Sequence, residues 1–273
     1  MQRLGEIASN AGTAERLWWA AALLFLFAFV GMGVVQRFDA RVLGPESVWA
    51  KPLKFAISTT VHFGSIALAV HWLRPSWSGS SWMTALAAAS VAAAVFEVAY
   101  IALQGGRGLT SHFNVSSPAY AALWSLMALA AVVVLAPMGV VGVLAALDDQ
   151  ARWPQAVRVG VALGMSGGAL MTLVTAFRMG ANMSHFVGAV PAEDGVVPLT
   201  GWSLRGADLR PAHFLATHMG QAVPLFALVV SSLLPLRGAA ALVGVFGASW
   251  AGLTLSVFTN ALAGRSLSTL LRL

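Results

Sequence analysis

Seven long apolar segments alternate with short polar segments along the chain. A helix needs about 20 apolar residues to cross the hydrocarbon core of a bilayer. The pattern therefore predicts an all-α integral membrane bundle of seven transmembrane helices. It forms one domain over residues 1–273, with residues 263–273 as an interfacial tail. The seven predicted helices are 16–35, 53–73, 83–104, 119–146, 157–179, 212–235 and 238–262.

The composition agrees with a lipid environment. Of 273 residues, 58% are hydrophobic and only 10% are charged, whereas a soluble domain carries about 25% charged residues. The net charge of +6 comes from scattered Lys and Arg near segment ends, which indicates membrane anchoring and excludes a nucleic-acid partner. Tryptophans near segment ends, such as Trp18, indicate an interfacial aromatic belt. The lipid bilayer is the expected partner, and membrane-protein partners stay open.

The polar segments differ between the two sides of the predicted bundle. We call one side the loop side, and it holds the longer segments, rich in Gly, Ser, His and Trp. It carries ten of the 16 Lys and Arg, which by the positive-inside rule places it in the cytoplasm. Several of these ten residues belong to polar motifs, so they are poor signals of membrane topology. We therefore favour the opposite orientation, with the N-terminus in the cytoplasm and the loop side outside it. The loop side comprises 36–52, 105–118, 180–211 and the tail from Arg265.

Polar residues inside the apolar segments fall on single helix faces. At 100° per residue, the spacing of Lys51, Lys54, Ser58 and His62 places them within an arc of ~80°. Polar groups at membrane depth cost free energy, so such stripes indicate a functional site or an internal hydrogen-bond network. Further stripes are Glu97, Tyr100, Gln104 and Arg107; Thr175, Arg178 and Asn182; and His213, Thr217 and Gln221.

Three ionisable residues are predicted to reach one depth. At 1.5 Å per residue, His62 lies about 13 Å, Glu97 about 10 Å and His218 about 9 Å from the loop-side ends of their helices. Paired histidines at one level are what a bis-His haem needs, and imidazole with carboxylate suits a divalent metal ion. Haem b or a divalent metal is therefore a candidate cofactor. The candidate ligands are His62, His112, His213 and His218.

Two interpretations of the polar set stay open, a ligand-binding site and a structural polar core. Under the first interpretation, the stripes converge on a net-basic cavity that is open to the loop side, and the residues that bind the ligand belong to these stripes. Under the second, they brace the helices to one another. The expected cavity residues are Lys54, Ser58, His62, Glu97, Tyr100, Gln104, Arg107, Arg178, Asp208, Arg210 and Gln221.

Two further local patterns bear on function. Three glycines around Arg107 predict a tight backbone that approaches a ligand closely. Ser111 and His112 are adjacent in sequence, which predicts side chains poorly placed to act as nucleophile and base.

Small residues such as Gly160 and Gly164 predict close helix–helix approach.

Several motifs resemble an uncharacterised family of bacterial seven-helix integral membrane proteins. They are Trp49-x-Lys51-Pro52-x-Lys54-Phe55, then Arg107-Gly-x-x-Ser111-His112-Phe113-Asn114, then Gly201-Trp202-Ser203, and Asp208-Leu209-Arg210-x-x-His213-Phe214-x-x-x-His218-x-x-Gln221-x-x-Pro224. The resemblance covers most of the chain and implies seven spans in the bacterial inner membrane. It implies no activity.

Three functions are consistent with the sequence. The first is binding of a small anionic ligand, a metal ion or a haem in the loop-side cavity. The second is a non-catalytic accessory or scaffold role in a larger membrane complex. The third is a zinc-dependent membrane lipid hydrolase, by fold-level analogy alone. Whether the protein is an enzyme, and which ligand it binds, are not determined by the sequence.

Overall fold

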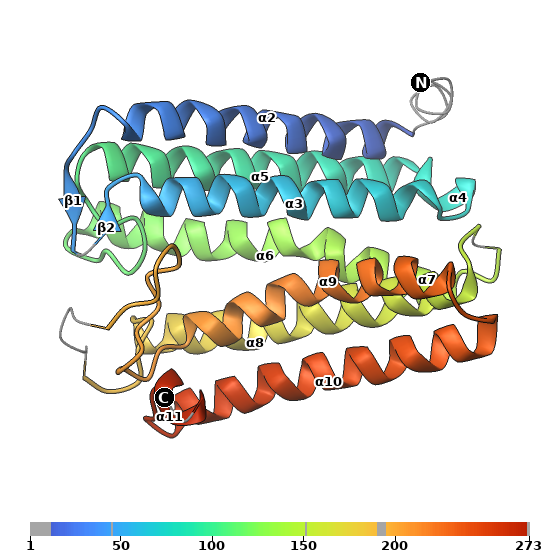
Figure 1. Cartoon of the computed structure of the whole chain (residues 1–273). Helices are drawn as coiled ribbons and strands as arrows, with labels where there is room; N and C mark the ends of the chain where they lie inside the picture. The colour runs from blue at the N-terminus through green and yellow to red at the C-terminus, as the bar shows by residue number, and fades with distance from the viewer. Residues whose placement is uncertain (1–11, 45, 151, 190–194, 272–273) are drawn as a thin grey trace.

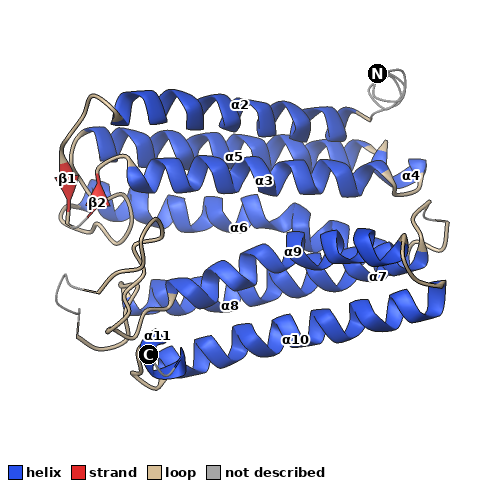
Figure 2. Ribbon diagram, viewed as in Figure 1, coloured by secondary structure: helices blue, strands red, loops and turns tan. Residues whose placement is uncertain are grey.

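The structure, a computed structural model, describes residues 12–44, 46–150, 152–189 and 195–271. Within them, seven helical stretches are long and apolar enough to cross a membrane, which confirms the predicted all-α bundle (Figure 2). The bounds are α2 (Thr13–Gln36), α3 (Ala50–His71), α5 (Ser81–Gly106), α6 (Pro118–Leu147), the continuous stretch α7 (Gln155–Val161), η1 (Ala162–Ser166) and α8 (Gly167–Asn182), α9 (Arg210–Ser231) and α10 (Leu236–Leu262).

Helix α2 begins at one end of the bundle and α10 finishes at the other, as seven crossings require (Figure 1). The short helix α4 (Pro75–Ser78) lies on the side opposite the loop side. The predicted interfacial tail contains the short helix α11 (Leu267–Leu271) on the loop side. Residues 272 and 273 of that tail, and residues 1–11, lie outside the described residues.

Helix starts follow from local chemistry. The hydroxyl oxygens of Ser80 and Ser117 accept the backbone N–H groups of Met83 and Tyr120, capping α5 and α6. Such caps satisfy donors that have no partner within the helix. Pro52 lies in the first turn of α3, where its missing N–H removes no helical hydrogen bond.

The helices form two groups. Helices α2, α3, α5 and α6 pack together, and α10 with α7 and α8 surrounds α9 (Figure 1). Trp18 is fully buried in the first group and donates its indole N–H to the Ser90 hydroxyl at 3.1 Å. The prediction that Trp18 lies in an interfacial belt is therefore wrong. Its polar atom finds a partner inside the bundle instead, as buried tryptophan usually requires.

Glycines allow the second group to pack closely. A Cβ at Gly160 would lie 2.5 Å from the Ala227 Cβ, and one at Gly164 would lie 2.8 Å from the Pro224 Cδ. Real Cβ atoms do not approach so closely, so these positions require glycine. This agrees with the expectation that small residues bring helices together.

The side opposite the loops is closed by ion pairs. The Arg74 backbone and side chain donate to both carboxylate oxygens of Asp148 at 2.8 and 2.9 Å. Burial raises the pKa of Asp148, but the hydrogen bonds from Arg74 outweigh it and hold the pKa below its ordinary value. The charges at this end therefore satisfy one another.

The loop side is built differently. A small antiparallel hairpin of β1 (Val42–Leu43) and β2 (Glu46–Ser47) pairs Val42 with Ser47 and Leu43 with Glu46. The chain leaving the hairpin passes directly over the end of α5, where a Cβ at Gly105 would lie 2.6 Å from the Val48 carbonyl oxygen. Gly105 thus lets the hairpin close over the bundle.

Candidate functional site

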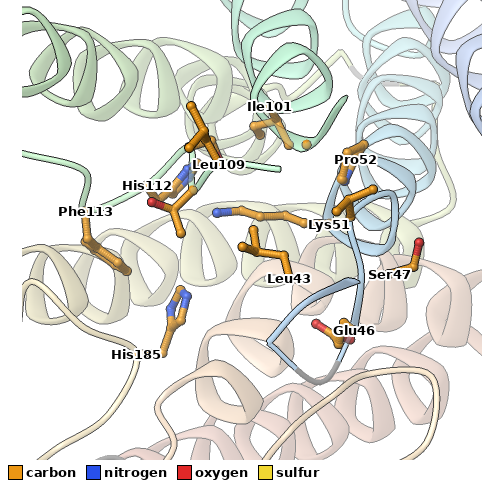
Figure 3. A pocket seen from close by; sticks show the side chains of 14 residues that line it. Leu43, Glu46, Ser47, Lys51, Pro52, Ile101, Leu109, His112, Phe113 and His185 are labelled. Carbon is orange, nitrogen blue, oxygen red and sulfur yellow. Dashed lines mark hydrogen bonds between the residues drawn. The ribbon is translucent and has the colours of Figure 1, made fainter. Parts of the chain in front are cut away.

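A hollow of about 390 Å³ lies on the loop side, and we call it the loop-side cavity. Its size falls in the range of small-molecule sites, about 300–1,000 Å³. Five parts of the chain form its walls (Figure 3). They are hairpin residues 43 and 46–48, Lys51 and Pro52 of α3, Ile101 and Gly105 of α5, loop residues 109–113, and His185.

Lys51 supplies the positive charge of the cavity. It lies in the first turn of α3, and its side chain extends across the hollow toward His112 (Figure 3). Its ammonium group makes no hydrogen bond and no ion pair with any described residue, and it lies 5.9 Å from the centroid of the Phe55 ring. The buried Glu97 carboxyl lies close enough for the two charges to interact. The donors of Lys51 are thus unused.

His112 forms the opposite wall. Its Nδ1 lies 3.2 Å from the Ser111 hydroxyl oxygen, so the two adjacent side chains do hydrogen-bond, contrary to expectation. The ring packs against Phe55 and Trp124 at centroid distances of 5.6 and 5.4 Å. Burial, and next the charge of Lys51, hold the pKa of His112 well below its ordinary value. His112 is therefore a neutral hydrogen-bonding group at pH 7.

His185 completes the cavity from the long loop. Its buried Nδ1 has no hydrogen-bond partner among the described residues. Burial, and next the charge of Lys51, lower the pKa of His185 to about 3, so this ring is also neutral at pH 7. A buried polar atom without a partner is costly and indicates a missing ligand or water.

The backbone is strained at Phe113, whose ring packs against His185. Phe113 has a φ of 58°, which a bulky residue rarely adopts. Its ring packs against Trp124 at 4.8 Å and His185 at 5.0 Å. Strained residues of this kind cluster at ligand sites, where surrounding packing enforces them.

A second hollow of about 520 Å³ lies between α2 and α3, and we call it the α2–α3 groove. Its walls are mainly apolar and include Phe29 of α2 with Leu53 and Ile57 of α3. It shares Glu46 and Ser47 with the loop-side cavity, so the hairpin separates the two hollows.

Lys54 and Arg210, both expected cavity residues, hold the long loop instead. Lys54 donates to Glu46 at 2.5 Å and to the Thr200 carbonyl oxygen at 2.8 Å. Arg210 donates to Asp208 through Nε and Nη2, and to the Gly201 carbonyl oxygen at 2.8 Å. Asp208 also accepts the Ser203 N–H. These charges are thus paired with one another and with the loop backbone.

Three expected metal or haem ligands have protein partners. The His62 Nε2 lies 3.0 Å from the Val134 carbonyl oxygen on α6. His213 Nδ1 lies 2.9 Å from the Thr175 hydroxyl on α8, and His218 Nδ1 lies 3.1 Å from Gln221 Oε1 on the same helix. Among the described residues, no group of three or more His, Asp or Glu could hold a metal ion. The expected common metal site of His62, His112, His213 and His218 is therefore not formed.

The remaining expected residues occupy separate positions. Gln104 joins its own stripe, donating to the Tyr100 hydroxyl at 3.2 Å and accepting from Arg107 at 3.3 Å. Ser58 is half-buried on α3, and Arg178 is exposed near the end of α8. None of these five residues lines the loop-side cavity. Of all the expected site residues, His112 alone lines it.

Two central residues of the cavity, Lys51 and His185, were absent from the expected set. Lys51 belonged to the stripe on α3, but a lysine at a helix start is equally consistent with contact to lipid head groups. His185 lies in an irregular loop, where periodicity carries no information. The polar stripe on α3 and the motif around Lys51 were the two patterns that pointed to this lysine.

Comparisons of the chain with protein-family models, with curated proteins and with solved structures return no match. The resemblance to a bacterial seven-helix family therefore stays a prediction, as does the bacterial inner membrane as its location. The helices themselves establish a multi-pass architecture suited to a lipid bilayer.

Proposed function

We propose that the protein binds a small oxyanion, such as a phosphate or carboxylate group, in the loop-side cavity. The observation that carries the proposal is the ammonium group of Lys51, which extends into the cavity without an ion pair among the described residues. An ammonium group has three donors and matches an anionic oxygen acceptor.

The neutral groups around Lys51 suit the same ligand. The unpartnered His185 nitrogen offers a hydrogen bond without adding charge, and the Ser111 hydroxyl is already shared with His112 Nδ1. The neighbouring cations Lys54 and Arg210 are paired with Glu46 and Asp208. Lys51 is therefore the cation that the cavity offers to an anionic ligand group.

Calorimetric titration of the purified protein with inorganic phosphate and with acetate tests the proposal. Lys51→Gln should weaken binding by about tenfold or more, which is about 1.4 kcal/mol. Arg178→Gln is the matched control, because it removes an exposed cation near the loop side that does not line the cavity. Equal affinities in the wild type and Lys51→Gln would refute the proposal.

An accessory or scaffold role is the second candidate. It is supported by the hydrogen bonds of His62 and His213, which join α3 to α6 and α9 to α8. Polar stripes used in this way brace the bundle and require no ligand. Native mass spectrometry of the gently solubilised protein tests this role, since a scaffold should carry a stoichiometric partner protein.

A zinc-dependent hydrolase finds less support. Asp208, an expected cavity residue whose carboxylate could bind zinc, is already engaged by Arg210 and by the Ser203 N–H. His112 and His213 would then need a third donor, and no suitable group of three exists among the described residues.

A further inference from the structure

The α2–α3 groove lies on a bilayer-facing surface and reaches the hairpin that separates it from the loop-side cavity. Ile57 is 36% exposed on α3 and lies about 10 Å along the helix from its start, at 1.5 Å per residue. Phe29 lies at a comparable depth on α2, seven residues before the helix ends. The groove therefore reaches into the layer that lipid chains occupy.

The groove and the cavity have complementary chemistry. The groove is lined mainly by apolar side chains, whereas the cavity adds Lys51 and two neutral imidazoles to its apolar wall, and its one carboxylate, Glu46, is paired with Lys54. Both hollows are lined by Glu46 and Ser47 of the hairpin, so a molecule that spans the hairpin contacts both. Only an amphiphile with an anionic head satisfies the two surfaces at once.

The rim of the groove is also apolar outside the helices. Leu199 lines the groove and is 95% exposed, and Phe38 just beyond α2 is 87% exposed. Exposed large apolar side chains at the end of a membrane span are favourable when they contact lipid. Both positions are therefore suited to the boundary between the head groups and the acyl chains.

From these observations we infer that the ligand is an anionic phospholipid that arrives laterally from the bilayer. Its phosphate binds Lys51 in the loop-side cavity, and an acyl chain lies in the α2–α3 groove. The phosphate accepts hydrogen bonds from the Lys51 ammonium and from the Nδ1–H of the neutral His185 ring. The inference rests on the proposed anion site and adds the class of molecule that occupies it.

Native mass spectrometry with defined ligands tests the inference. Three probes are compared at equal concentration in detergent: phosphatidylglycerol, phosphatidylcholine and soluble glycerol 3-phosphate. The groove is blocked by Ile57→Trp, and Leu68→Trp is the matched control because Leu68 is exposed on the same helix away from the groove. Both substitutions lie on the lipid-facing surface, and size-exclusion profiles verify folding.

We expect phosphatidylglycerol to bind about tenfold or more tightly than phosphatidylcholine and glycerol 3-phosphate. Ile57→Trp should reduce phosphatidylglycerol binding and leave glycerol 3-phosphate binding unchanged, Lys51→Gln should reduce both, and Leu68→Trp should affect neither.

Two results overturn the inference in distinguishable ways. If Lys51→Gln weakens glycerol 3-phosphate binding but Ile57→Trp leaves phosphatidylglycerol binding unchanged, the lipid inference fails and the anion site stands. If Lys51→Gln changes neither ligand, both fail.

Discussion

The Lys54 ammonium lies 2.8 Å from the carbonyl oxygen of Thr200, a residue 146 positions further along the chain. The same ammonium pairs with Glu46 of the hairpin. Lys54 therefore ties the start of α3 to both the hairpin and the long loop, the two irregular segments that enclose the loop-side cavity together with residues 109–113.

Removing this tie should loosen the long loop. Lys54→Gln should raise amide hydrogen exchange at residues 198–203 and lower the free energy of unfolding by about 1 kcal/mol, since a half-exposed charged pair contributes modestly. Arg178→Gln should leave exchange in this segment unchanged. Unaltered exchange in Lys54→Gln would show that the loop is held by other contacts.

Gly201 should be intolerant of a side chain for two separable reasons. Its φ of +68° is unfavourable for other residues, and a Cβ there would lie within contact distance of the Glu46 carboxylate. Gly201→Ala should cost more than about 1 kcal/mol in thermal unfolding.

Gly188 isolates the conformational part of this cost. It has a φ of +81° but open space around an added Cβ. Gly188→Ala should therefore destabilise the protein less than Gly201→Ala. Equal effects of the two substitutions would mean that the approach of Glu46 is unimportant.

His62 should act as a brace between helices. Replacing His62 by Ala removes the hydrogen bond to Val134 on α6, and we expect a loss of about 0.6–2 kcal/mol. His218→Ala should cost less, because its partner Gln221 lies on the same helix. Unfolding in mixed detergent measures both.

The same variants discriminate against a haem site. A bis-His haem bound by His62 and His218 would give a Soret band that either substitution abolishes. We expect the absorption spectrum to be unchanged by both, because the two rings already have protein partners. A band lost in His62→Ala would contradict the bracing role.

Acid should destabilise the cavity. The pKa of His185 is about 3 in the folded protein and near its ordinary value of 6.5 when unfolded. Between these values the unfolded chain binds more protons, so stability falls as the pH drops from about 6.5 toward 3. His185→Gln should flatten this part of the curve of melting temperature against pH. An identical slope in the variant would assign the acid sensitivity to other groups, including His112.

The bundle was predictable because the bilayer imposes a simple requirement. A helix must be long and apolar, so the seven segments and most boundaries follow from the sequence to within a few residues. Helical periodicity also grouped Tyr100, Gln104 and Arg107 correctly, since their side chains are hydrogen-bonded along one face.

The site was less predictable because its walls are irregular. The hairpin and the loops around His112 and His185 follow no periodicity, so their positions depend on long-range contacts such as Lys54 with Thr200. The adjacency of Ser111 and His112 suggested poor geometry, but the turn between them brings Oγ and Nδ1 to 3.2 Å. Ionisable residues within the spans were identified as important, yet their partners are loop carboxylates, backbone carbonyl groups and neutral side chains, as for Lys54, His62 and His213.

Locating a bound anion tests the central claim most directly. Crystals of the protein soaked in selenate should give an anomalous peak in the loop-side cavity, with a selenate oxygen about 3 Å from the Lys51 Nζ. The same peak should be absent from crystals of Lys51→Gln. Selenate found elsewhere on the protein while the loop-side cavity stays empty would contradict the account.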